Sequence, residues 1–290
     1  MRSEESSIRI FHGLWALTNR ELKKWYKEPV FLLLSLIQPV IWLGLFGKAM
    51  NIGAIFTEQS FNLPGLNIPK QVIDEISKYA LLNSFGTTDY FSFLAIGMLA
   101  FVSVFTSITT GMSIVWDRRF GILDKLLSTP IPRGTIIISK VLNGIIRSLT
   151  QSAIALIIAI LLGLDLTHFS LIGILETFSA LFLMTIGLGS IFVMVAIRST
   201  SWQSQMAVMN LLNLPLTFTS NAMFPIQFMP DWLQYVAKIN PVSYAIDICR
   251  QALIGSTGFA SMTFEYAYLS IFAFIFSFIG ILLSWKALNK

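Results

Sequence analysis

Between two long apolar stretches lies the charged sequence Trp116-Asp117-Arg118-Arg119-Phe120-Gly121-Ile122-Leu123-Asp124-Lys125-Leu126-Leu127-Ser128-Thr129-Pro130-Ile131-Pro132-Arg133. Its basic residues favour the cytoplasmic side of a membrane. Four aliphatic residues recur in it at helical spacing, which predicts a short amphipathic helix: Ile122, Leu123, Leu126 and Leu127. Pro130 and Pro132 should end this helix, because proline lacks an N–H donor and disfavours helical geometry before it. Such a helix could dock on another protein, and the alternative is a helix lying on lipid.

Composition places the chain in a membrane. Of its 290 residues 55% are hydrophobic and 12% are charged, and the mean hydropathy is +0.72. A soluble domain carries roughly 25% charged residues. We therefore expect an all-α polytopic membrane protein with residues 1–290 as a single transmembrane domain. The net charge of +5 is explained by topology rather than by nucleic-acid binding, and the single cysteine, Cys249, excludes an intrachain disulfide.

Six apolar windows are long enough to span a bilayer, which takes about 20 residues. They are Val30–Met50, Tyr90–Trp116, Thr135–Leu164, Leu171–Ile197, Trp202–Phe224 and Phe264–Trp285. An even number of spans puts both termini on one side. Lys and Arg number 14 on that side and 5 on the other, so we expect both termini in the cytoplasm. We expect the membrane to be the plasma membrane of the cell.

Three further segments lie outside these windows. Residues 1–29 mix apolar and basic residues, and predict an amphipathic helix at the inner interface with its basic side toward head groups. Residues 51–89 form a long external loop with one short surface helix, and residues 117–133 form the cytoplasmic loop. Residues 225–253 are apolar but broken by prolines. They predict two short re-entrant helices in the outer leaflet, or else two helices lying flat on the outer surface.

Three blocks of residues resemble the ABC type-2 permease family, the membrane subunits of bacterial and archaeal exporters. The first runs from Arg20 to Pro39. The second holds Asp117-Arg118-Arg119, Gly121 to Asp124, Leu126, Thr129-Pro130 and Gly134 to Lys140. The third holds Met223 to Ile226, Met229 to Leu233, Asn240-Pro241, Tyr244, Asp247 and Arg250. One departure is that Asp117 and Asp124 stand where the family more often has Glu, which shortens each side chain by one methylene.

The resemblance implies a half-transporter that pairs with a second copy and engages a separate ATP-binding cassette subunit. MgATP would then bind the partner subunit, and this chain would bind no cofactor. The sequence agrees, because it holds no G-x-x-x-x-G-K-[ST] phosphate loop. The resemblance makes the 117–129 segment a coupling helix. Its coupling residues are Asp117, Arg118, Arg119, Gly121, Ile122, Leu123, Asp124, Leu126, Leu127 and Thr129.

Two further groups of residues are candidates for substrate handling. Polar and large apolar residues inside the spans predict a substrate path: Gln38, Phe105, Thr109, Met209, Asn213 and Thr217. The proline-broken outer segment predicts a gate: Met223, Phe224, Pro225, Pro230, Trp232, Asn240, Pro241, Tyr244 and Arg250. Met- and Phe-rich walls suit an amphipathic or lipidic substrate, such as a drug, a lipid or a glycan-linked molecule.

Two other functions compete with an exporter subunit. An ion- or proton-coupled secondary transporter would carry charged residues near the midplane. Arg147 is the candidate, and a structural or cavity-lining role is preferred for it over a proton relay. An intramembrane enzyme would need a catalytic or metal-binding cluster. Asp165 and His168 are close in sequence, but no third ligand accompanies them, and His12 lies far away. The sequence therefore predicts a transport subunit without catalytic residues or a metal site.

Overall fold

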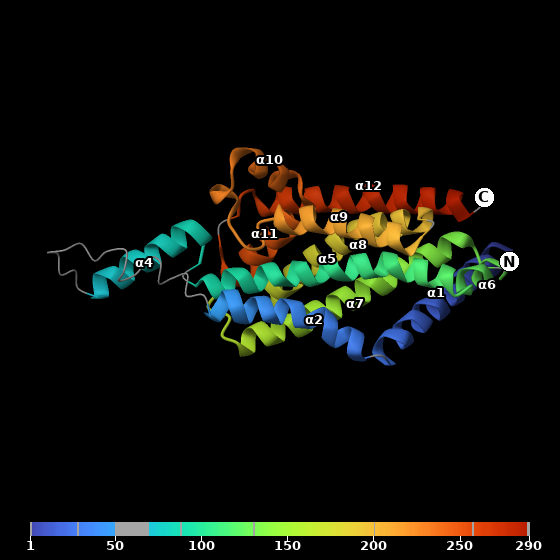
Figure 1. Cartoon of the computed structure of the whole chain (residues 1–290), viewed down its shortest axis with the longest axis horizontal. Coiled ribbons are helices and arrows are strands. Elements are labelled where there is room, and N and C mark those ends of the chain that lie inside the picture. Colours follow the sequence, from blue (N-terminus) through green and yellow to red (C-terminus); the bar gives the residue numbers. More distant parts are fainter. Residues whose placement is uncertain are drawn as a thin grey trace.

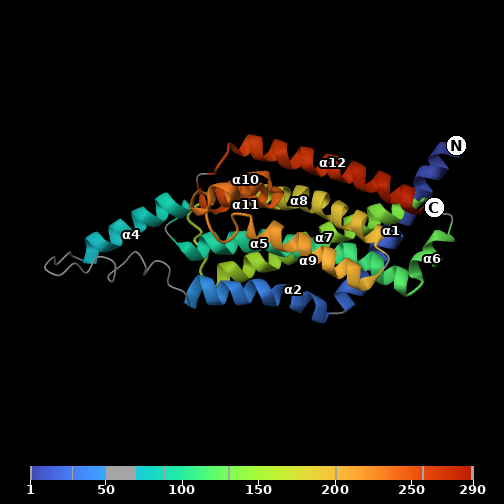
Figure 2. The ribbon, with the colours of Figure 1, turned by 45° about the horizontal axis from the view of Figure 1, so that its top comes forward.

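The computed structural model describes residues 2–27, 29–49, 70–87, 89–129, 131–199, 201–256 and 258–288. All regular elements within these ranges are helices. The long ones lie side by side in an elongated bundle (Figures 1 and 2). They are α2 (Pro29–Trp42), which continues as the π-helix η1 (Leu43–Ala49), α5 (Tyr90–Arg119), α7 (Arg133–Leu161), α8 (Leu171–Arg198), α9 (Trp202–Phe218) and α12 (Met262–Leu288).

Four of the six predicted spans are long and apolar enough to cross a membrane. They lie within Lys78–Arg119, Arg133–Leu161, Leu171–Arg198 and Met262–Lys286. The first predicted span is divided between α2 and η1, and its last residue, Met50, lies outside the described residues. The fifth forms α9, which has only 17 residues, because the chain turns after Phe218 instead of continuing to Phe224. The count of six spans therefore stays a prediction.

The remaining helices lie at the two ends of the bundle (Figures 1 and 2). One end, called here the α6 end, carries α1 (Arg2–Lys27), α6 (Ile122–Leu127) and the last turns of α12. The other, called the α11 end, carries α4 (Lys70–Phe85), the 3₁₀ turn η2 (Ile226–Phe228), α10 (Asp231–Ile239) and α11 (Pro241–Ile254). The start of α1 and the end of α12 thus lie together, but the side of the membrane that each end faces stays a prediction.

The centre of the bundle is formed by α5 and α8, which contribute several large side chains that are fully buried. Phe91, Leu94, Met98, Met184 and Phe192 are each 2% exposed or less. Polar side chains join α5 to α7 and α7 to α8, and hydrogen bonds of this kind between membrane helices contribute about 0.6 kcal/mol each. They link Ser103 to Ser152 at 3.1 Å, Thr106 to Gln151, and Ser148 to Thr185 at 3.1 Å. The core between the α6 end and the α11 end is therefore closely packed.

Candidate functional site

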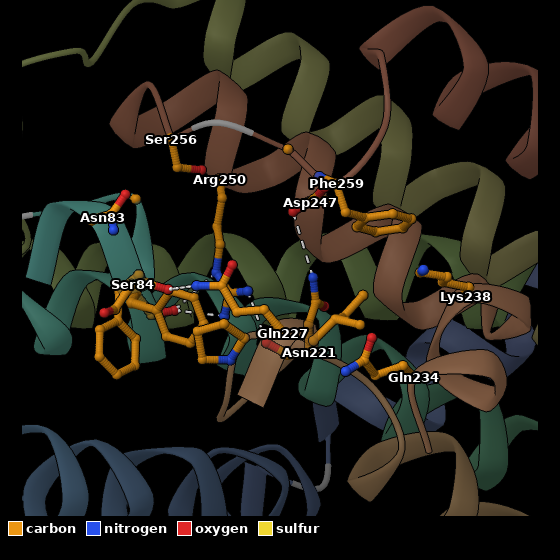
Figure 3. Close-up of a pocket in the computed structure, with 16 residues that line it drawn as sticks. Asn83, Ser84, Asn221, Gln227, Gln234, Lys238, Asp247, Arg250, Ser256 and Phe259 are labelled. Atoms are coloured by element: carbon orange, nitrogen blue, oxygen red, sulfur yellow. Dashed lines mark hydrogen bonds between the residues drawn. The ribbon is translucent and has the colours of Figure 1, made fainter. Parts of the chain in front are cut away.

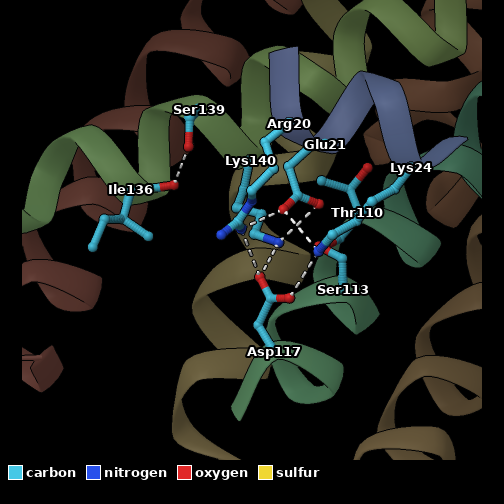
Figure 4. A network of polar contacts seen from close by, with 9 residues as sticks. All are labelled: Arg20, Glu21, Lys24, Thr110, Ser113, Asp117, Ile136, Ser139 and Lys140. Carbon is cyan, nitrogen blue, oxygen red and sulfur yellow. Dashed lines mark hydrogen bonds and ion pairs between the residues drawn. The ribbon is translucent and has the colours of Figure 1, made fainter. Parts of the chain in front are cut away.

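At the α6 end, five charged side chains from three helices form one network (Figure 4). Asp117, near the end of α5, contacts Lys140 of α7 at 2.5 Å and Lys24 and Arg20 of α1 at 3.4 and 3.5 Å. Glu21 of α1 contacts the same Lys140 at 3.1 Å and Arg20 at 2.6 Å. We call these five residues the charge cluster. It binds α1, α5 and α7 to one another directly beside the loop that carries α6.

The charge cluster is buried, and its cations act on the pKa of Glu21. Asp117, Lys140 and Glu21 are 3%, 3% and 8% exposed. Burial alone would raise the pKa of Glu21, but the positive charges of Lys140, Arg20 and Lys24 outweigh this effect and lower the pKa to about 2. The network therefore depends on its cations, because a buried carboxylate without a partner is strongly destabilising.

Beside the charge cluster, α6 packs on its own chain. Leu123 is 5% exposed and lies with Leu17 of α1 and Ile136 of α7 in a small apolar core. Leu126 and Leu127 pack against this core and are half-buried. The aliphatic face expected to enter a groove on a partner therefore lies largely against α1 and α7. An amphipathic pattern specifies which face is buried, but it does not specify which surface covers it.

The other predicted coupling residues have varied surroundings. Gly121 has φ +65°, a left-handed conformation that favours glycine and lets the chain turn from α5 into α6. Arg118 donates to the carbonyls of Ser199 and Ile197 at 2.7 and 2.6 Å, and so closes the C-terminus of α8. The rest are exposed or half-buried at the surface: Arg119, Ile122, Asp124 and Thr129.

Arg147, considered above for a role in transport, lies beside α1. Its guanidinium carbon lies 5.8 Å from the ring centroid of Trp25. This distance is within the range of a cation–π contact. The contact fits the structural role preferred for this residue.

Two predicted substrate-path residues line one small pocket between α2, α5 and α9. Thr217 donates to Asn213 Oδ1 at 3.2 Å, and both face a cavity of about 70 Å³. Its other walls are apolar and aromatic: Trp42, Met98, Phe101, Leu214, Phe218 and Met223. The pocket thus joins a polar pair to a hydrophobic wall.

The remaining substrate-path residues lie elsewhere. Met209 is buried in the core at 1% exposure. Thr109 donates to the Thr106 carbonyl within α5 at 2.9 Å, and Phe105 is half-buried. The side chain of Gln38 lies outside the described residues. Met223, assigned from the sequence to the outer gate, is instead a wall of the pocket.

At the α11 end, Arg250 holds two segments of backbone together. It donates to the carbonyls of Phe93, Asn221 and Ala222 at 2.8–3.3 Å, and its guanidinium carbon lies 3.3 Å from the Phe93 ring centroid. The residue is 2% exposed. Arg250 therefore fastens α11 to the start of α5 and to the chain after α9.

The predicted gate residues lie in and around the short helices α10 and α11. Asn240 accepts from the Val242 amide and caps α11, and Pro241 is the first residue of α11. Pro230 directly precedes α10 as its N-cap residue. Tyr244 donates to the Lys238 carbonyl at 2.7 Å, whereas Phe224 and Trp232 are exposed and Pro225 is half-buried.

A polar pocket of about 310 Å³ opens at this end (Figure 3). Asp247 and Arg250 of α11 reach it from the bundle, and Lys238 and Gln234 reach it from α10. We call it the outer pocket. Its other labelled walls are Asn83, Ser84, Asn221, Gln227, Ser256 and Phe259.

Sequence reasoning missed the partners within both ends. Arg20 and Lys24 were expected to face lipid head groups, but they turn to Asp117 instead. The available signal was Glu21, an acidic residue amid a basic run. Asp247 and Glu265 also lie close together, and this proximity was not predicted because the two residues are on different helices.

A match to known proteins decides the family. The model of the ABC-2 type transporter family matches residues 12–254, which is most of the chain. The chain belongs to that family. It is therefore a multi-pass membrane subunit of an ABC transporter, and membership implies partnership with an ATP-binding cassette subunit.

Relatives extend the match to nearly the whole chain. A transport permease named ycf38 from Cyanophora paradoxa is 28% identical over 99% of this chain and 93% of its own length. The doxorubicin resistance ABC transporter permease DrrC of Mycobacterium tuberculosis is 24% identical over 87% of this chain and 80% of its own. The multidrug ABC transporter permease YbhR of Escherichia coli is 29% identical over 56% of this chain and 44% of its own.

Proposed function

We propose that this ABC-2 permease moves an amphipathic or lipidic substrate outward, with energy from ATP hydrolysed on a separate subunit. The observation that carries the proposal is the joining of α1, α5 and α7 beside α6 by the charge cluster. A force applied to α6 by a cytoplasmic partner would be transmitted to α1, α5 and α7 together. MgATP would bind the partner, and both termini would lie in the cytoplasm below a plasma membrane.

The proposed docking surface differs from the one that the aliphatic pattern suggests. Asp124, Lys125 and Thr129 are exposed on α6 and just after it, whereas Leu123 is buried. Arg119 lines a neighbouring pocket of about 310 Å³ with Trp202 and Gln203. The partner would therefore contact the charged side of α6, and the aliphatic side would anchor α6 to the permease.

Charge reversal on α6 tests this docking. The double variant Asp124→Lys with Lys125→Glu keeps the net charge and changes only exposed positions. We expect it to release the ATP-binding subunit in a detergent pull-down while the melting temperature stays unchanged. Lys78→Glu, an exposed position on α4 at the opposite end, is the matched control and should retain the partner. Full retention of the partner by the double variant would refute docking on this surface.

The substrate class is proposed from the pocket between α2, α5 and α9. Its aromatic and methionine walls suit an apolar body, and the Asn213–Thr217 pair suits one polar group. Relatives named for daunorubicin, doxorubicin and multidrug transport support a substrate of this kind. Asn213→Leu should reduce substrate-stimulated ATP hydrolysis about tenfold, since one hydrogen bond is worth about 1.4 kcal/mol. Leu211→Val on the exposed face of α9 should leave it unchanged.

A homodimer is the proposed assembly, on the strength of the family resemblance. The mass of the purified complex tests it, with two permease chains and two ATP-binding subunits expected. The alternative function, an ion- or proton-coupled secondary transporter, is disfavoured by membership of the ABC-2 family. Transport by the permease alone, without an ATP-binding subunit, would reverse that preference.

A further inference from the structure

Two carboxyl groups meet at the α11 end, one from α11 and one from α12. The side chains of Asp247 and Glu265 lie close enough to interact, on either side of Gln251 and Gly258, and they are 5% and 0% exposed. Around them, the Phe259 amide donates to Asp247 Oδ2 at 2.7 Å, and Gln251 Nε2 donates to Glu265 Oε2 at 2.7 Å. Asn221 Nδ2 lies 3.5 Å from Asp247 Oδ1 (Figure 3). We call Asp247 and Glu265 the carboxyl pair.

The carboxyl pair lacks a cation of its own. Within the described part of the chain, no ion pair joins a lysine or arginine to either residue, and no donor reaches Glu265 Oε1. Arg250 attracts Asp247 at longer range, but its printed hydrogen bonds all go to backbone carbonyls. Two ionised carboxylates buried side by side, with no cation bound directly to either, repel each other. A proton on one of the two would remove this repulsion and supply an O–H donor to the other.

We propose that Asp247 and Glu265 form a proton-binding site that holds α11 to α12 and is open to the outer pocket. In the protonated state, one O–H donates to the other carboxylate and supplies the donor that Glu265 Oε1 otherwise lacks. Asp247 is itself a wall of the outer pocket, so water there can exchange the proton. The site therefore responds to the pH of the compartment that the α11 end faces.

Loss of the proton should loosen a defined part of the fold. Asp247 binds the Phe259 amide and contacts Asn221, so repulsion within the pair acts on the chain before α12 and on the turn after α9. Asn221 is also a carbonyl ligand of Arg250. Deprotonation would thus weaken the contacts that hold the walls of the outer pocket in place, whereas protonation would preserve these contacts.

The sign of the pH dependence follows from burial. Burial raises the pKa of Asp247 above its ordinary value, because the charged form loses water. A carboxyl group with a raised pKa stabilises the fold at low pH, and its contribution is lost as the pH rises through the folded-state pKa. Other titratable or charged groups face the pair or its pocket: Arg250, Cys249 and Tyr244 of α11, Lys238 of α10, and Tyr90 of α5, which acts through Arg250. His168 packs on Gly255 at the far end of α11.

Infrared spectroscopy of the full chain in lipid nanodiscs tests the proton directly. We expect a C=O stretching band of a protonated carboxyl group at neutral pH, which disappears at alkaline pH. It should be absent from Glu265→Gln and from Asp247→Asn, each of which removes one member of the pair. A wild-type spectrum at neutral pH without this band would overturn the proposal, and this measurement needs no variant to fold.

Thermal unfolding supplies the second readout. The wild-type melting temperature should fall by about 3–6 °C between about pH 6 and about pH 10. Glu265→Gln should remove most of this dependence, because an amide can replace the shared proton by an N–H donor. His168→Asn is the control and should keep the dependence. An equal alkaline loss in Glu265→Gln, or stabilisation of the wild type by sodium over choline at constant ionic strength, would argue against a bound proton.

Discussion

The two ends of the bundle bury carboxyl groups in opposite ways. At the α6 end, Asp117 and Glu21 lie among Lys140, Arg20 and Lys24, and these cations lower the pKa of Glu21. At the α11 end, Arg250 makes its hydrogen bonds to backbone carbonyls, and Asp247 is left in contact with Glu265. Three cations thus neutralise one pair of carboxyl groups, and a proton is proposed to neutralise the other.

This difference suits the proposed roles of the ends. The charge cluster joins α1, α5 and α7 through paired charges and is proposed to transmit force from a partner. A pair that depends on a proton responds to its surroundings. We therefore expect the α6 end to be sensitive to loss of a cation and the α11 end to be sensitive to pH.

The largest effect is expected from Lys140→Met. This variant leaves Asp117 and Glu21 buried without their shared cation, which should lower the free energy of unfolding by about 3–5 kcal/mol. Lys24→Met is the matched control. The Lys24 side chain is 46% exposed, so its loss should cost less than about 1 kcal/mol. Denaturant unfolding in detergent measures both, and equal effects would show that the network does not depend on Lys140.

Acid should act on the α6 end. The pKa of Glu21 is lowered from 4.5 to about 2 by its folded-state neighbours. Its contribution, at most about 3 kcal/mol, is therefore present above pH 4.5 and is lost as the pH falls toward about 2. Glu21→Gln should flatten this acid limb while leaving the alkaline limb assigned to the carboxyl pair. A melting-temperature profile against pH for the two proteins separates the ends.

Arginine geometry provides a third comparison. Arg250→Lys should cost about 2 kcal/mol, because one ammonium cannot reach the carbonyls of Phe93, Asn221 and Ala222 together. Arg118→Lys, at the α6 end, should cost about 1 kcal/mol, since it is partly exposed and binds two carbonyls. A reversed order in unfolding measurements would contradict the fastening role given to Arg250.

Two glycines allow the smallest test. A Cβ added at Gly258 would lie 2.2 Å from Gln251 Nε2 and 2.8 Å from Asp247 Oδ2. Gly258→Ala should therefore disturb the carboxyl pair and lower the free energy of unfolding by about 1 kcal/mol. Gly134→Ala is the control at the α6 end, where nothing lies within 4 Å of the added Cβ, and it should be neutral or slightly stabilising. The comparison uses the melting temperature and the alkaline pH profile of each variant.

Much of the fold was predictable because it rests on local signals. Long apolar runs gave the helices of the bundle, and α7 and α8 begin and end within a few residues of their predicted windows. Prolines gave the break between α10 and α11. The end of α9 was missed, because the predicted window ran on through the polar residues 219–221 to Phe224, whereas the chain turns after Phe218.

The contacts within the ends were not predictable from local signals. Leu123 shows an apolar face, but only the fold places Leu17, more than a hundred residues earlier, against it. Arg20 and Lys24 resemble interfacial residues until Asp117 is placed beside them. Asp247 and Glu265 lie on separate helices, α11 and α12, and their contact depends on how these two helices pack together. The predicted roles of the coupling, substrate-path and gate residues still await the experiments described.

α5 gives the two ends a common mechanical part. It is one unbroken helix of 30 residues, about 45 Å long, with Asp117 near one terminus and the carbonyl of Phe93, which binds Arg250, near the other. Hydrogen bonds along its axis make a helix stiff against compression, so a push at one terminus arrives at the other as a shift of the whole rod. A shift of α5 by even a fraction of its pitch would move the Phe93 carbonyl relative to Arg250. Substrate release at the α11 end would then require only a rigid-body shift of α5, without a chain of side-chain rearrangements through the middle of the protein.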